Sequence, residues 1–80
     1  MTLYRIYFDS NSGDELQRYD LSIPGSLEDL EPIKAMLKIG LHVILYQPDE
    51  LEVEAVLDFD ELNGRWVASP IWSTLRHLTR

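Results

Sequence analysis

The chain contains no cysteine, which excludes disulfide bonds and thiolate metal ligands and leads us to expect a reducing, cytoplasmic location. It also lacks a long apolar run near its start, because Arg5, Asp9, Asp14, Glu15 and Arg18 interrupt the N-terminal region. A signal peptide or a membrane-spanning helix needs a longer uncharged stretch. The sequence therefore predicts a soluble protein with no membrane partner.

Motifs of catalysis and cofactor binding are absent as well. The two histidines, His42 and His77, are far apart in the sequence, and neither has a second ligand at metal-binding spacing. The glycines are isolated, so the chain has no glycine-rich phosphate loop, and none of its serines lies in a nucleophile elbow. We therefore expect a protein that is not an enzyme, with no catalytic residue, no metal and no cofactor.

Positive charge is missing from the middle of the chain. The net charge is −7, and residues 47–61 hold seven acidic residues and no basic one, whereas residues 62–80 hold three basic residues and no acidic one. Such an acidic segment has two interpretations: a solvated strand face that keeps the protein soluble, or a surface that binds a basic partner. The first is the more common origin of a run of charges.

What the chain does contain is a strongly alternating segment. From Leu51 to Phe59 every odd position is apolar, and every even position except Val56 is acidic. This period of two predicts a strand with one buried and one solvated face. Together with residues 41–46 and 65–69, it predicts a three-stranded antiparallel meander. The loops are residues 48–50 and 61–64, and Gly64 is expected in a left-handed conformation.

The register of this meander follows from keeping apolar residues opposite apolar ones, because a slip of one residue would turn the apolar face toward water. The first strand could bury either its odd or its even positions, and only the odd set matches the acidic strand. The predicted pairs are Val43–Ala55, Leu45–Val53, Leu57–Ala68, Phe59–Trp66 and Asp60–Arg65. Tyr46 is then opposite Glu52, and Ile44 is opposite Glu54, on the outer face.

The N-terminal half is predicted to form a hairpin and a helix. Residues 3–8 and 18–23 alternate like strands, with a turn cluster at residues 9–14 between them. Pro24 and Gly25 are expected to end the second strand, and Ser26 is a good helix N-cap. Because Pro32 interrupts a single helix, we expect one turn at 27–30 and a short helix at 32–38 that covers an open side of the sheet.

The C-terminal residues 70–74 are interpreted as a corner, and residues 75–78 as a short strand that closes the sheet against the first strand. Strand count and order over residues 41–78 resemble the plan of SH3-like small barrels. The ligand-binding motifs of SH3 domains are absent, so the resemblance implies no binding residue. The predicted core is Ile6, Leu21, Leu37, Val43, Leu45, Val53, Leu57, Phe59 and Trp66.

These observations predict one domain, residues 1–80, that is mainly β (α+β). It consists of about five antiparallel strands in a strongly bent sheet or small SH3-like barrel, with one short helix near 32–38. A chain of this length buries a thin core, roughly 60 to 65% of its unfolded surface.

The functional prediction is a non-enzymatic protein-interaction or regulatory module of unknown specificity. Large apolar side chains outside the core, Tyr46, Trp72 and Ile44, are its candidate contacts, and they serve self-association equally well.

The alternative is an acidic inhibitor or nucleic-acid mimic that binds a basic protein through residues 49–61, with Glu52, Glu54 and Asp58 as contacts. Its strand is central in the meander, so these acids are not needed to prevent edge pairing.

Nucleic-acid binding is disfavoured by the overall charge. Its candidate residues are Arg65, Arg76, His77 and Arg80, with Trp66 and Trp72 nearby in sequence.

Overall fold

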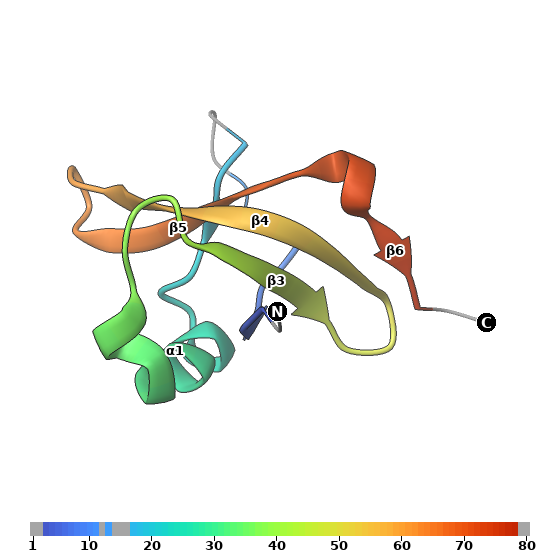
Figure 1. Ribbon diagram of the computed structural model, residues 1–80, viewed down its shortest axis with the longest axis horizontal. Helices are drawn as coiled ribbons and strands as arrows, with labels where there is room; N and C mark the ends of the chain where they lie inside the picture. Colours follow the sequence, from blue (N-terminus) through green and yellow to red (C-terminus); the bar gives the residue numbers. More distant parts are fainter. Residues whose placement is uncertain (1–2, 12, 14–16, 79–80) are drawn as a thin grey trace.

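The computed structural model describes residues 3–11, 13 and 17–78. Its elements are β1 (Arg5–Tyr7), β2 (Tyr19–Asp20), α1 (Pro24–Leu30), η1 (Glu31–Met36), β3 (His42–Gln47), β4 (Leu51–Asp60), β5 (Arg65–Pro70), η2 (Trp72–Thr74) and β6 (Arg76–His77). The strands form one mixed sheet that is curled into a half-barrel (Figure 1). Over the described residues, no helix is long and apolar enough to cross a membrane.

The predicted meander is confirmed in strand order and in register. Strands β3, β4 and β5 are neighbours, and all five predicted residue pairs are present, together with Tyr46–Glu52 and Ile44–Glu54. Both loops use the left-handed region, at Asp49 (φ 61°) and at Gly64 (φ 64°). Asp and Gly are among the residues that adopt this conformation at least cost, so local sequence is sufficient to define both turns.

The predicted N-terminal hairpin is wrong. Strand β1 pairs in parallel with β3, whereas β2 pairs antiparallel with β5, so the two lie at opposite ends of the order β1-β3-β4-β5-β2. Of the hairpin, the described residues keep a single bridge between Gly13 and Tyr19. The parallel pairing is possible because more than a dozen residues, including α1 and η1, connect β1 to β3. Ser12 and Asp14 of the predicted turn lie outside the described residues.

The last strand also has a different partner from the one predicted. Instead of closing the sheet against the first strand, β6 pairs with Leu51 and Glu52 of β4. It therefore continues the edge begun by β5, after the short turn η2, as Figure 1 shows along the upper and right-hand side. Thus β4, the longest strand, has β3 on one side and β5 followed by β6 on the other.

The helical region spans residues 24–36, with a change from α-helix to 3-10 helix next to Pro32. The predicted separation into a turn at 27–30 and a helix at 32–38 is wrong, because the two parts form one continuous helical region of 13 residues. Pro32 changes the helix type without ending the helix. The region begins three residues earlier than predicted and ends at Met36, since Leu37 is already extended (ψ 130°). Pro24 occupies the first turn, where it needs no N–H partner, and Ser26 is not the N-cap. Ser26 is buried inside α1, and its hydroxyl donates a hydrogen bond to the Tyr7 carbonyl.

Helix α1 packs closely on the outer edge of β1. A Cβ at Gly25 would lie 2.7 Å from Cδ2 of Tyr7, so this position requires glycine for the close approach. The Tyr7 N–H donates to Oδ2 of Asp29 at 2.8 Å, and the Tyr7 carbonyl accepts from Ser26. Side chains of α1 therefore satisfy backbone groups of an edge strand that would otherwise be open to pairing.

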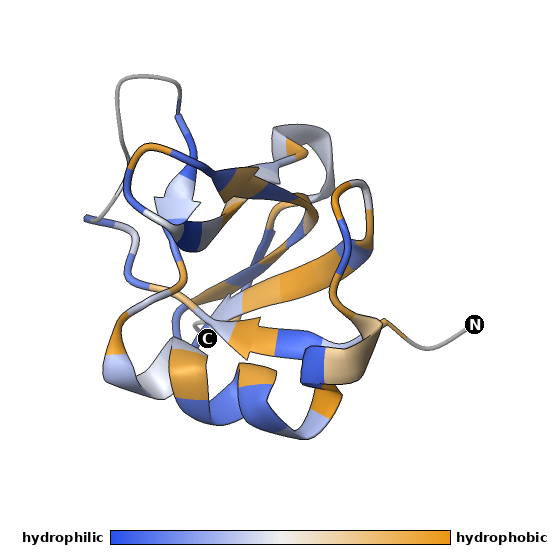
Figure 2. Ribbon diagram, turned by 90° about the vertical axis from the view of Figure 1, so that its left-hand side faces the viewer, coloured by the Kyte–Doolittle hydropathy of each residue, from blue (hydrophilic) through white to orange (hydrophobic). Residues whose placement is uncertain are grey.

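The core lies on the inner face of the curled sheet. Six of the nine predicted core residues are fully buried: Ile6, Leu21, Val43, Leu45, Val53 and Leu57. Leu37 and Trp66 pack against this core but are only half-buried, as is Phe59, which meets the Trp66 ring near the β4–β5 turn. Figure 2 shows the alternation of apolar and polar residues along the strands that produces this division.

Candidate interaction surface

The outer face of the sheet carries a row of directly opposed polar side chains from four strands. In register, Tyr7 of β1 is opposite Tyr46 of β3, Tyr46 is opposite Glu52 of β4, and Glu52 is opposite Arg76 of β6. Directly opposed residues project to the same face of a sheet. Three separate parts of the chain thus contribute to one surface.

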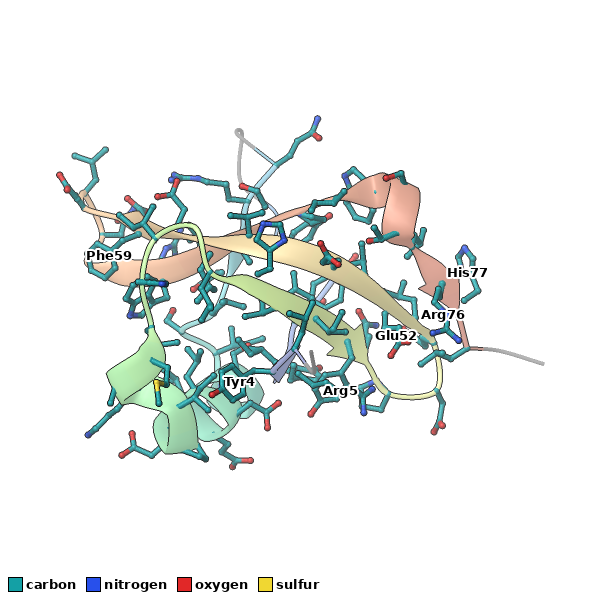
Figure 3. All side chains as sticks on the ribbon, viewed as in Figure 1. Tyr4, Arg5, Glu52, Phe59, Arg76 and His77 are labelled. Atoms are coloured by element: carbon teal, nitrogen blue, oxygen red, sulfur yellow. The ribbon has the colours of Figure 1, made fainter. Side chains whose placement is uncertain are left out.

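Glu52 is the centre of this row and binds two arginines. The Arg5 guanidinium donates from Nη2 to Oε2 of Glu52 at 3.5 Å, and Nη1 of Arg76 lies 3.2 Å from Oε1. Figure 3 shows Glu52 between the two arginines, with His77 beyond Arg76. The Glu52 side chain is 21% exposed, whereas those of Arg5 and Arg76 are 57% and 74% exposed. The carboxylate is therefore largely covered, and both guanidinium groups reach into solvent.

Tyr46 supports this cluster from the side of β3. The Arg5 guanidinium lies 4.6 Å from the centre of the Tyr46 ring, a cation–π geometry. The Tyr46 hydroxyl donates to Oδ2 of Asp29 at 2.8 Å, and this hydrogen bond, followed by burial and by the charge of Asp29, raises the pKa of Tyr46. Tyr46 is half-buried, and its ring positions Arg5 on this surface.

The remaining predicted acidic contacts also have partners within the chain. His42 Nδ1 lies 3.0 Å from Glu54, and Arg18 lies 3.6 Å from Asp58. Glu52 binds two arginines. Each of the three acids proposed as a binding stripe, Glu52, Glu54 and Asp58, therefore already faces a basic side chain. The outer face of β4 is therefore much less negative than its sequence indicates.

The far end of β4 carries a second, separate cluster. Arg65 lies 3.4 Å from Asp60 and 3.1 Å from Asp20. The Asn63 side chain donates to the Asp60 carboxylate at 2.8 Å, and this hydrogen bond is the main reason why the pKa of Asp60 is lowered. These contacts stabilise the β4–β5 turn.

Trp72, the other predicted contact, belongs to η2, a turn that is hydrogen-bonded to the Glu54 backbone through the Ile71 N–H and Thr74 Oγ1. It is 45% exposed in η2, and its ring packs edge-on against Tyr19 at 6.0 Å between centroids. The Tyr19 ring in turn meets the buried Phe8 at 5.2 Å. Trp72 therefore extends the core side of the sheet. The structure brings Tyr46, Glu52 and Glu54 together and places Asp58 farther along β4. Trp72 directly follows Ile71, whose N–H donates to the Glu54 carbonyl, but the Trp72 ring packs on Tyr19.

Sequence reasoning missed that Arg5 and Arg76 both bind Glu52. Alternation over residues 3–8 places Arg5 on the face opposite to the core residue Ile6, but the predicted neighbour of that strand is wrong. Arg76 was considered only with the other C-terminal cations. The structure places Arg76 and Arg65 at opposite ends of β4: Arg76 is opposite Glu52, and Arg65 is opposite Asp60. Arg80 lies outside the described residues.

Within the described part of the chain, no group of three or more His, Cys, Asp or Glu side chains is placed to hold a metal ion. Comparison with protein-family models, with curated proteins and with solved structures finds no match to this chain. The function is therefore argued from the surface alone.

Proposed function

We propose that the chain is a non-enzymatic protein-interaction module whose contact surface is the outer face around Glu52, formed by Arg5, Ile44, Tyr46, Glu52 and Arg76. One observation carries the proposal: two exposed arginines share one carboxylate, and one of them, Arg5, also lies over a tyrosine ring. Arginine and tyrosine are enriched among the residues that dominate binding energy. Side chains that are already ordered lose less entropy on binding.

The size of the molecule is compatible with such a contact. A typical stable interface covers about 800 Å² on each partner, which is roughly 15% of the 5379 Å² that this chain exposes. The Glu52 cluster alone is smaller than that. We therefore expect the contact to extend over the half-buried Ile44 and the exposed His42 on β3, and over His77 on β6.

Site-specific photo-crosslinking tests the proposal. A photoreactive amino acid replaces Ile44, at the centre of the outer face, or Lys34, on the exposed surface of η1, and each variant is irradiated in cells of its source. We expect one discrete protein adduct from position 44 and none from position 34. Equal adducts from both positions, or none from either, would contradict the proposed surface.

The alternative, an acidic inhibitor that binds a basic protein through residues 49–61, makes the opposite demand. Its partner must displace Arg5 and Arg76 from Glu52 and His42 from Glu54. Changing Glu52 and Glu54 together to glutamine would then weaken the adduct-forming interaction strongly at low salt, and high salt would weaken it in the unmodified protein. Retention of the adduct by the unmodified protein and by the double variant, each at low and at high salt, would exclude this alternative.

A further inference from the structure

We infer that the partner presents a carboxylate group to Arg5 and Arg76, so that an acidic peptide segment is the ligand of this surface. The inference rests on the proposed function and specifies its partner. It is based on the charge balance around Glu52, on the exposed donors of both arginines, and on the partners that both arginines already have within the chain.

The charge balance at the cluster is positive although the whole protein is negative. Within the cluster itself one carboxylate faces two guanidinium groups, a sum of +1 over these three side chains. A further carboxylate, that of Asp29, lies next to Tyr46 and accepts hydrogen bonds from the Tyr46 hydroxyl and the Tyr7 N–H. The next acidic residue on this face, Glu54, is engaged by His42 at 3.0 Å. At physiological ionic strength charges farther than about 8 Å are largely screened, so an approaching group senses the arginines more than the net charge of the chain.

The two arginines have hydrogen-bond capacity to spare. A guanidinium group carries five N–H donors, and between described residues one terminal nitrogen of each arginine lies within ion-pair distance of Glu52. With side chains 57% and 74% exposed, most of the remaining donors are accessible to a ligand. A carboxylate matches the planar fork of arginine and binds it in bidentate fashion.

Both arginines already have partners within the chain before any ligand arrives. Arg5 lies over the ring of Tyr46, and Tyr46 is fixed by its hydrogen bond to Asp29 on α1. Arg76 is opposite Glu52 in the β4–β6 ladder. Glu52 therefore acts as an internal substitute for the ligand, because it occupies donors that an external carboxylate could use.

A carboxylate is favoured over a phosphate group by the size of the charge. The sum of +1 over Arg5, Arg76 and Glu52 matches a monovalent carboxylate, whereas a phosphate carries up to two negative charges and a nucleic acid many. The net charge of −7 disfavours such polyanions further.

Titration of the isotopically labelled full chain with a short oligoglutamate peptide tests this inference, with NMR detection of the amides and of the arginine Nε–H groups. We expect the Arg5 and Arg76 signals to shift. Arg5→Gln and Arg76→Gln should each weaken binding about three- to tenfold. Lys34→Gln removes the same charge from η1 and should change the affinity by less than about twofold. The variants' amide spectra verify that each remains folded.

Glu52→Gln gives the sharpest outcome, because it removes the internal competitor. We expect it to tighten oligoglutamate binding about threefold or more, the opposite of what a basic partner requires. Weaker binding by Glu52→Gln, an equal effect of Lys34→Gln, or no binding at all would overturn the inference. Tighter binding of a phosphoserine peptide or of single-stranded DNA would overturn the choice of carboxylate, and self-association through Arg5 and Arg76 would identify a second copy instead.

The two proposals fail separately. If the crosslink from position 44 persists while oligoglutamate does not bind, the contact surface stands and the acidic partner is excluded. If the crosslink is absent as well, the proposed function falls with it.

Discussion

Asp29 joins the helix to two strands, and its removal gives a quantitative test of the fold. One carboxylate oxygen accepts the Tyr7 N–H at 2.8 Å and the Tyr46 hydroxyl at 2.8 Å. A hydrogen bond to a charged group contributes about 1.5–3 kcal/mol, and both bonds are only partly buried, so each should lie near the lower end. We expect Asp29→Ala to lower the free energy of unfolding by about 2–4 kcal/mol.

This loss is large for the molecule. A domain of this length has a free energy of unfolding of about 4–12 kcal/mol, and a small protein loses about 1 kcal/mol per molar urea. The midpoint of urea unfolding should therefore fall by about 2 M or more. Glu28→Ala is the matched control, because it removes the same charge from the adjacent, exposed position of α1.

A double-mutant cycle separates the two hydrogen bonds. Tyr46→Phe removes only the hydroxyl donor and should cost about 1–2 kcal/mol. That bond is already lost in Asp29→Ala. The loss of unfolding free energy in the double variant should therefore be about 1 kcal/mol smaller than the sum of the losses in the two single variants. Strict additivity, or an Asp29→Ala variant within about 0.5 kcal/mol of Glu28→Ala, would refute this account of how α1 is attached.

Two further predictions concern the core and the titration of Tyr46. Leu57→Ala should cost about 2–4 kcal/mol in urea unfolding, because the side chain is fully buried; a loss under about 1 kcal/mol would contradict its place in the core. The pKa of Tyr46 should lie above its ordinary value near 10, since the neutral hydroxyl donates to Asp29. Its contribution to stability is thus complete below pH 10 and is lost as the pH rises through the folded pKa. Ring-carbon NMR should show this pKa falling in Asp29→Ala, and an unchanged value would contradict the assigned cause.

Local pairing is what the sequence could predict. Alternation over residues 51–59 and the turn residues Asp49 and Gly64 act between neighbours in the chain, and they determined β3, β4, β5 and their register. The pair Tyr46–Glu52 at the centre of the candidate surface followed from that register.

Pairing between distant segments could not be predicted. The alternating residues 3–8 fit any neighbour with an apolar inner face, and the choice of β3 depends on how residues 24–36 cross the sheet. That crossing is defined by tertiary contacts, namely Gly25 against Tyr7 and Asp29 with Tyr46. Strand β6 is only two residues long, so its sequence shows no alternation of apolar and polar residues from which a strand could be predicted. Both arginines of the surface lie on these two strands, which is why the cluster was missed.

The position of the Glu52 cluster has a consequence for folding during synthesis. Arg5 and Arg76 are 71 residues apart in sequence, and β1 and β2 also await partners that follow much later. Contacts between distant segments require loop closure before they stabilise the chain, and topologies rich in them fold slowly. At about 5–20 residues per second, synthesis delivers β6 last. The nascent chain can therefore form the β3–β4 hairpin early, whereas the proposed binding surface exists only after residues 76 and 77 have joined β4.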